Sequence, residues 1–213
     1  MKKHLLLLAA VAAGMLATQA ASAQVFGQLG GARPLDMNSR LFGAYAGFSK
    51  SESELFAQLR LSFYPGVDFG FQGGLSRVSV NDHSRTTVKL GGDFKAAVLR
   101  ASESSPIDLS LGAALGVSSA EDFNLLGVGP EIVASRTWAT GTGSNLTAYS
   151  GLVLLFTRSD LGTSNNNDVS VPIRFGLSFE PNQDLRLLAE VTVAASDQIN
   201  DDLKLTLGAN FPF

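Results

Sequence analysis

The sequence predicts an all-β protein that crosses a membrane as an antiparallel up-and-down β-barrel of about ten strands. Three observations lead to this prediction. The chain begins with an export signal, most of the remainder alternates between apolar and polar residues, and the last alternating segment ends in phenylalanine. Together they indicate a transmembrane barrel that is exported across one membrane and inserted into a second.

Residues 1–23 predict a cleaved signal peptide. Lys2 and Lys3 form a positive start, Leu5 opens an apolar stretch, and Ala21-Ser22-Ala23 has the small residues that signal peptidase requires. The apolar stretch is shorter than the roughly 20 residues of a helical membrane span. We therefore expect Gln24 to be the first residue of the mature protein.

The composition excludes several other classes of protein. The 213 residues include no cysteine, which rules out disulfides, zinc–thiolate sites and a cysteine nucleophile. The formal net charge is −3 and no Lys or Arg cluster occurs, so nucleic acid is not an expected partner. After the signal, no apolar run reaches about 18 residues, which excludes a helical membrane protein. The length fits a single barrel domain, residues 39–213.

The expected strands are segments in which apolar and polar residues alternate. In residues 202–213 every odd position is Leu, Ala or Phe, and every even position is polar, Gly or Pro. Such alternation gives a strand two faces with different surroundings. In chain order the expected strands are residues 39–48, 54–64, 67–80, 86–99, 107–118, 125–138, 146–158, 168–180, 184–196 and 202–213.

The length of these segments favours a membrane barrel over a soluble β-sandwich. A tilted membrane crossing needs about 9–11 residues per strand, whereas strands of soluble proteins are usually about 5–6 residues long. One face is almost purely aliphatic and aromatic, and the other is rich in Gly, Ser and charged residues. We expect the first face to contact lipid and the second to line the lumen.

The connections between the segments predict the topology. Tight turns are expected at Pro65-Gly66-Val67 and Pro181-Asn182-Gln183, at the end of the barrel where Phe213 lies, and this end is expected to be periplasmic. Residues 100–106 and 139–145 also connect strands at this end. Eight or twelve strands remain alternatives to ten, because segment boundaries are weakly determined by sequence. The opposite end receives the polar loops 50–53, 81–85, 119–124, 159–167 and 197–201.

Residues 24–38 precede the first expected strand and form a separate N-terminal segment. Their start, residues 25–31, is rich in glycine. We expect this segment to be an extra strand or a short plug that lies in or beneath the barrel.

With these features the chain resembles the small bacterial outer-membrane barrels, such as the OmpA-type transmembrane domain and the OmpW-like group. In those families the last strand is recognised by the barrel assembly machinery, and the resemblance gives this role to Leu205, Leu207, Phe211 and Phe213. It also implies contact with outer-membrane lipids, including lipopolysaccharide. Pro212 departs from the pattern because proline has no N–H to donate, and we expect it to lie beyond the last paired residue.

His83, the sole histidine after the signal, is the strongest candidate for catalysis. A lipid or peptide hydrolase with a rim site near His83 is therefore the enzymatic alternative, although a solvated loop histidine explains the residue more simply. Ser84 points to the opposite side of an extended chain, so it is a poor partner. No calcium loop, metal-spaced histidine pair or nucleophile elbow is present. We therefore predict no catalytic residue, no metal and no cofactor.

Charged residues on the polar face are expected to point into the lumen, because the lipid face would penalise Arg or Lys by about 2–4 kcal/mol at mid-depth. Lys89, Asp93 and Lys95 share one face of a strand and are expected to form a mixed cluster. The expected lumen residues are Arg60, Lys89, Asp93, Lys95, Glu131, Arg174, Arg186 and Glu190.

A second ion pair is expected between neighbouring strands. The register implied by a three-residue turn after Glu180 sets Arg174 directly opposite Glu190, within reach of a cross-strand pair.

Two non-enzymatic functions fit a lumen of this kind. Its mixed charges either set the selectivity of a narrow porin-like channel or hold a structural envelope barrel shut with salt bridges. The many inward Gly, Ser and Ala residues favour a thin water path. An adhesin is less favoured, because the longest expected loop, residues 159–167, is of modest length. The transported solute and the oligomeric state are not predicted.

Overall fold

The computed structural model describes residues 29–80, 83–103, 105–120, 123–141, 143–161, 164–195 and 203–213. The predicted signal peptide, residues 1–23, lies outside this part of the chain. Among the described residues, no helix has the length and apolar character to cross a membrane. The strands are β1 (Arg40–Phe48), β2 (Glu52–Tyr64), β3 (Val67–Val80), β4 (His83–Leu99), β5 (Asp108–Ala120), β6 (Phe123–Ala139), β7 (Asn145–Val153), β8 (Leu155–Leu161), β9 (Ser164–Asn182), β10 (Leu185–Ala195) and β11 (Lys204–Pro212).

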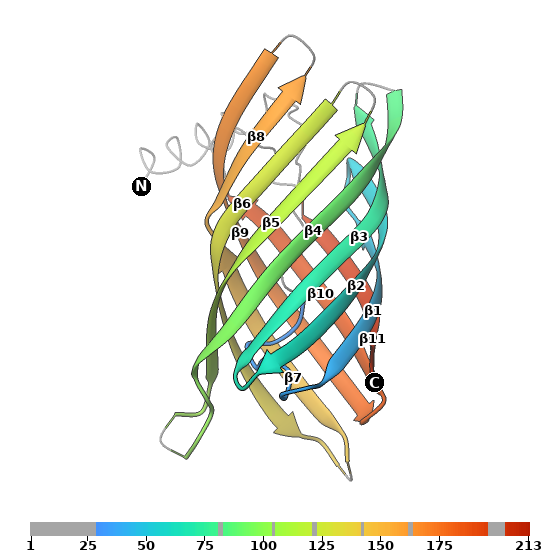
Figure 1. Ribbon diagram of the computed structural model, residues 1–213. Coiled ribbons are helices and arrows are strands. Elements are labelled where there is room, and N and C mark those ends of the chain that lie inside the picture. Colours follow the sequence, from blue (N-terminus) through green and yellow to red (C-terminus); the bar gives the residue numbers. More distant parts are fainter. Residues whose placement is uncertain are drawn as a thin grey trace, which may run out of the picture.

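The strands form one closed antiparallel barrel (Figure 1). The last strand, β11, pairs with β1, so the sheet has no free edge. β7 and β8 lie end to end between β6 and β9, and both keep the same register with these neighbours. Together they act as one strand interrupted at Leu154, which confirms the predicted ten-stranded barrel.

Two prolines explain the interruption at Leu154. Its N–H donates to the carbonyl of Pro130 in β6 (3.0 Å), but Pro130 has no N–H to return. On the other side of this strand, the regular pairing of β7 with β9 ends at Leu152 opposite Ile173. The next residue of β9 along this ladder is Pro172. Because proline cannot donate to the ladder, hydrogen bonding weakens on both sides of the same point.

The two faces of the wall follow the alternation in the sequence. Leu55 and Leu90 point outward and are 68% and 61% exposed. Their chain neighbours Glu54 and Lys89 point inward and are buried. An apolar exterior around a polar interior is the arrangement required when lipid surrounds the barrel.

The barrel ends differ in how far the strands continue. The lower end in Figure 1 carries the turns Pro65-Gly66 and Gln183-Asp184. At the upper end the strands are longer than predicted, since β9 begins at Ser164 and leaves a connection shorter than the expected loop 159–167. Ser164 and the three asparagines after it pair regularly with β8. Both faces of this β8–β9 hairpin meet water, so its sequence has no reason to alternate between apolar and polar residues. Its backbone hydrogen bonds continue without that pattern.

The position of Pro212 differs from the prediction, because it lies opposite Leu41 and does not fall beyond the paired residues. The next residue, Phe213, donates its N–H to the carbonyl of Arg40 (3.1 Å). Since hydrogen-bonded and non-hydrogen-bonded pairs alternate, the nitrogen of Pro212 faces away from β1. On that side the pairing with β10 has already ended, at Arg186 opposite Asn210. The missing donor therefore costs no ladder hydrogen bond.

Candidate functional site: the barrel lumen

All of the predicted lumen residues except Arg186 are buried. Arg60, Lys89 and Glu190 are each 3% exposed. The side chain of Arg186 lies near the lower rim and is 35% exposed, where its Nε contacts Glu180 at 2.9 Å. The buried charges divide into three groups at different heights of the lumen.

The upper group joins two lysines to two glutamates. Lys89 contacts both Glu52 and Glu54, the latter at 2.9 Å, and Lys204 contacts Glu54 at 2.5 Å. These residues come from β4, β2 and β11, so the ion pairs cross the lumen between strands that are not hydrogen-bonded to each other. Sequence reasoning missed three of the four residues. Lys204 falls at an even, polar position of its alternating segment, which was a usable signal, whereas Glu52 was assigned to a loop.

The lower group is centred on Arg60. Its guanidinium contacts Asp68 and, at 2.7 Å, Asp93. Asp93 also accepts a hydrogen bond from Gln72 (2.6 Å), and the ammonium of Lys95 lies 3.8 Å from Asp68. Asp68 was missed although it shares the even positions of its segment with Gln72. All five side chains are buried.

Lys89, Asp93 and Lys95 therefore do not form the predicted mixed cluster. They share one face of β4, but Lys89 belongs to the upper group, whereas Asp93 and Lys95 belong to the lower group. Their ion-pair partners lie on other strands, since Asp93 binds Arg60 of β2 and Lys95 lies beside Asp68, its pairing partner on β3.

The middle group contains Arg174, which forms an ion pair with Glu131. The predicted register was wrong, because Arg174 lies opposite Thr192, and Glu190 lies opposite Gly176. The turn consists of Gln183-Asp184, and a register shift follows between Leu185 and Leu187, which displaces the two strands relative to the expectation. The carboxylate of Glu190 accepts a hydrogen bond from the hydroxyl of Tyr149 (2.8 Å).

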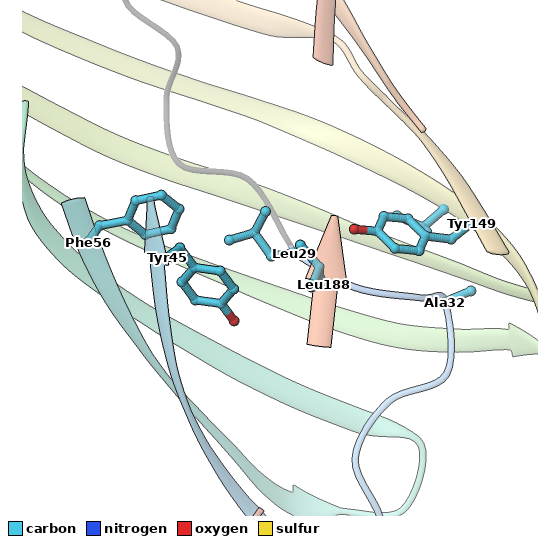
Figure 2. Close-up of a cluster of buried hydrophobic side chains, with 7 residues drawn as sticks. Leu29, Ala32, Tyr45, Phe56, Tyr149 and Leu188 are labelled. Carbon is cyan, nitrogen blue, oxygen red and sulfur yellow. The ribbon is translucent and has the colours of Figure 1, made fainter. Parts of the chain in front are cut away.

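Apolar side chains surround the middle group inside the barrel. Figure 2 shows Tyr45, Phe56, Leu188 and Tyr149 around the N-terminal segment. The rings of Tyr45 and Phe56 stack with their centroids 4.9 Å apart. Glycine is required beside Tyr45, since a Cβ on Gly208 would lie 2.1 Å from that ring. The alternating pattern alone did not predict this apolar layer inside the lumen.

Residues 29–36 of the N-terminal segment lie in the lumen and form no strand. Leu29 and Ala32 are buried among the apolar side chains just described. The hydrogen bonds that hold the segment include those from the N–H of Ala32 to Ser135 Oγ (2.9 Å), from the N–H of Leu35 to Asp68 (2.8 Å), and from Lys95 Nζ to the carbonyl of Gly31 (2.9 Å). The barrel wall contributes side chains to these contacts, and the segment contributes backbone groups.

The lumen is therefore a cross-braced polar interior. Taking a charge out of water costs several kcal/mol, and this cost is offset only when each ion keeps well-placed partners. Each group contains at least one ion pair between non-adjacent strands, which fixes those side chains in place. A path for solutes past these groups requires the N-terminal segment or the ion pairs to move.

The described residues offer little to the enzymatic alternative. The backbone of His83 pairs with Val80 at the top of the β3–β4 hairpin, but its side chain lies outside the described part of the structure. Within the described ranges, no group of three His, Asp or Glu side chains is placed to hold a metal ion.

Comparison by sequence finds no protein-family model and no curated protein that matches the chain. Comparison of structures finds the COG4313 outer membrane channel from Pseudomonas putida F1, with a TM-score of 0.50, 10% identity, and coverage of 88% of this chain and 100% of that chain. The fold is that of a bacterial outer-membrane β-barrel.

Other solved outer-membrane barrels are similar over most of the chain. The N-terminal β-barrel domain of Pseudomonas aeruginosa OprF has a TM-score of 0.39 and 10% identity, and covers 84% of this chain and 100% of its own. The KdgM porin has a TM-score of 0.41 and 9% identity, and covers 81% of this chain and 99% of its own. At such low identities the likeness concerns the fold alone.

Proposed function

We propose that this chain is a non-enzymatic, porin-like barrel of the bacterial outer membrane, with a narrow polar lumen that residues 29–36 close. The observation that carries the proposal is the placement of this segment inside a polar lumen, where it is held by hydrogen bonds to wall side chains. The segment belongs to no strand, so it can leave without breaking the hydrogen-bond ladder of the barrel wall. Export by residues 1–23, and a periplasmic position of the lower end, belong to the same proposal.

Two further observations support a channel over a hydrolase. The buried polar residues run from the upper group to the lower rim, so polar surface is available along the lumen once the segment moves. The similar protein from Pseudomonas putida is described as an outer membrane channel. The second candidate function is a permanently closed structural barrel, which the cross-lumen ion pairs favour.

Single-channel conductance in a planar lipid bilayer separates these two functions. We would compare the protein from Gln24 onward with a variant that lacks residues 24–35, and with Ala32→Glu. Ala32 is 1% exposed, so a glutamate at this position cannot fit and should expel the segment. We expect rare or small openings for the first protein and frequent, larger conductance steps for both variants.

Met37→Glu is the matched control, because Met37 directly follows residues 29–36 in the chain but is 52% exposed. It should conduct like the unmodified protein. Folding of every variant is verified by a heat-dependent shift on gels. If the folded deletion variant and Ala32→Glu are both silent, the channel proposal is wrong and the structural barrel is correct.

A further inference from the structure

A cavity of about 340 Å³ opens at the lower end of the barrel, between residues 29–36 and the wall. Its size lies within the usual range for small-ligand sites, which is about 300–1,000 Å³. The segment forms one side of the cavity, and the lower ends of strands such as β1, β6 and β9 form the other. The cavity is therefore a vestibule at the mouth of the lumen.

Positive charge predominates in this vestibule. Its lining includes five cationic residues, Arg33, Arg40, Arg60, Lys95 and Arg186, against three acidic residues, Asp36, Asp68 and Glu180, and a fourth carboxylate, Asp93, binds Arg60 from outside the lining. This excess is local, because the whole chain carries a formal charge of −3. The position of the excess at a cavity mouth would raise the local concentration of anions.

The arginines of the vestibule retain donors for a ligand. Arg33 is exposed and forms no ion pair with the described part of the chain. Arg60 is 3% exposed, and its Nε has no hydrogen-bond acceptor among the described residues. Arg186 is bound to Glu180, but both side chains are partly exposed and accessible to a competing anion. A guanidinium binds carboxylate and phosphate oxygens through two parallel hydrogen bonds.

Neutral donors complete the lining. Thr137 and Thr147 share a hydrogen bond of 2.8 Å at the rim, and Ser135, Ser178 and Asn210 lie in the same wall. Hydroxyl and amide groups of this kind bind the uncharged polar atoms of a solute. The lining therefore matches a small, polar molecule that carries more than one negative charge.

We infer that the vestibule is a binding site for a small solute with two or more carboxylate or phosphate groups. The inference deepens the proposed function by naming the class of solute that occupies the mouth of the channel. Arg33 and Arg186 bind its anionic groups, and the hydroxyl-bearing wall orients the remainder.

Isothermal titration calorimetry of the detergent-solubilised protein from Gln24 onward, at low ionic strength, tests the site with citrate as the probe. Sorbitol is the uncharged comparison. We expect saturable binding of citrate and no binding of sorbitol. Arg33→Gln and Arg186→Gln should each weaken citrate binding about tenfold, since each removes charge-assisted hydrogen bonds to the anion.

Arg136→Gln is the matched control. Arg136 lies at the same end of the barrel but on its outer face, with its guanidinium 5.4 Å from the centroid of the Trp138 ring. It removes the same charge from outside the vestibule and should leave citrate binding unchanged. Equal weakening by Arg136→Gln and Arg33→Gln, or no saturable heat with citrate, would overturn the inference.

The outcomes for this site and for the channel are independent. A barrel that conducts but does not bind citrate contradicts the anion site alone. A barrel that binds citrate but stays silent after the segment is removed contradicts the channel alone.

Discussion

Lys89 is the residue at which loss of one charge should be most costly. It is 3% exposed and contacts two buried carboxylates, Glu52 and Glu54. Lys89→Met leaves these carboxylates with Lys204 as their remaining cation in the described part of the chain. Removing one partner of a buried ion pair leaves the other charge buried without a compensating opposite charge. We therefore expect the free energy of unfolding to fall by about 3–5 kcal/mol. Urea unfolding of the refolded barrel in lipid vesicles measures this change.

Lys50→Met is the control for that measurement, because Lys50 is an exposed cation near the same end of the barrel. Its loss should change the free energy of unfolding by less than about 0.5 kcal/mol. An equally small change for Lys89→Met would mean that water enters the upper group and screens its charges.

The same residues show what the sequence can predict about the lumen. Alternation assigned Lys89, Arg174 and Glu190 to the inward face, and they are buried there. It did not identify their partners, because a partner depends on register and on the width of the lumen. Arg174 binds Glu131, two strands away, whereas Glu190, which was expected to lie opposite Arg174, lies opposite Gly176. The direction in which a side chain points can be predicted from one strand alone. The residue with which it forms an ion pair depends on how all the strands of the closed barrel are arranged.

At the scale of elements, a change in the terminal strand can distinguish an effect on assembly in the cell from an effect on the stability of the folded barrel. Phe213 is the last residue of the chain and is 67% exposed, so its removal leaves no cavity in the packed barrel wall. We expect deletion of Phe213 to change the free energy of unfolding in vesicles by less than about 1 kcal/mol. If the assembly machinery recognises the terminal aromatic residue, the same deletion should strongly reduce the folded barrel in cell outer membranes.

Phe63→Ala is the comparison for this deletion, because Phe63 is also an outward phenylalanine near the lower end, at 57% exposure. It should leave the cellular yield of heat-shifted barrel nearly unchanged. A similar loss of yield for both variants would show that general surface hydrophobicity matters, and not the terminal signal.

The elements themselves were largely predictable, and the exceptions have physical causes. Strand positions within the membrane span follow from the change of environment at every second residue. Alternation is lost at the first residues of β9, where both faces meet water, so the sequence placed the start of this strand too late. The contacts of residues 29–36 were beyond prediction, because a segment without secondary structure has no period and its place depends on the shape of the lumen.

At the scale of the whole molecule, the apolar outer surface should be embedded in lipid, and Trp138 can report its depth. Trp138 is the sole tryptophan of the chain, lies near the lower end of β6, and is 41% exposed. Tryptophan favours the interface between lipid headgroups and acyl chains. The neighbouring guanidinium of Arg136, 5.4 Å from the ring centroid, is suited to the phosphate level of the same interface.

Fluorescence quenching by brominated lipids measures that depth directly. We expect lipids brominated near the headgroup end of the acyl chain to quench Trp138 more strongly than lipids brominated near the bilayer centre. We expect this order of quenching because Trp138 lies next to the last residue of β6, at the lower end of the barrel wall. The part of the wall that spans the membrane lies above it. Stronger quenching from the bilayer centre would place the lower end inside the membrane, and an absence of quenching would mean that this face of the barrel does not contact lipid. Only a shallow position is consistent with strands that cross the membrane and a vestibule that opens to water.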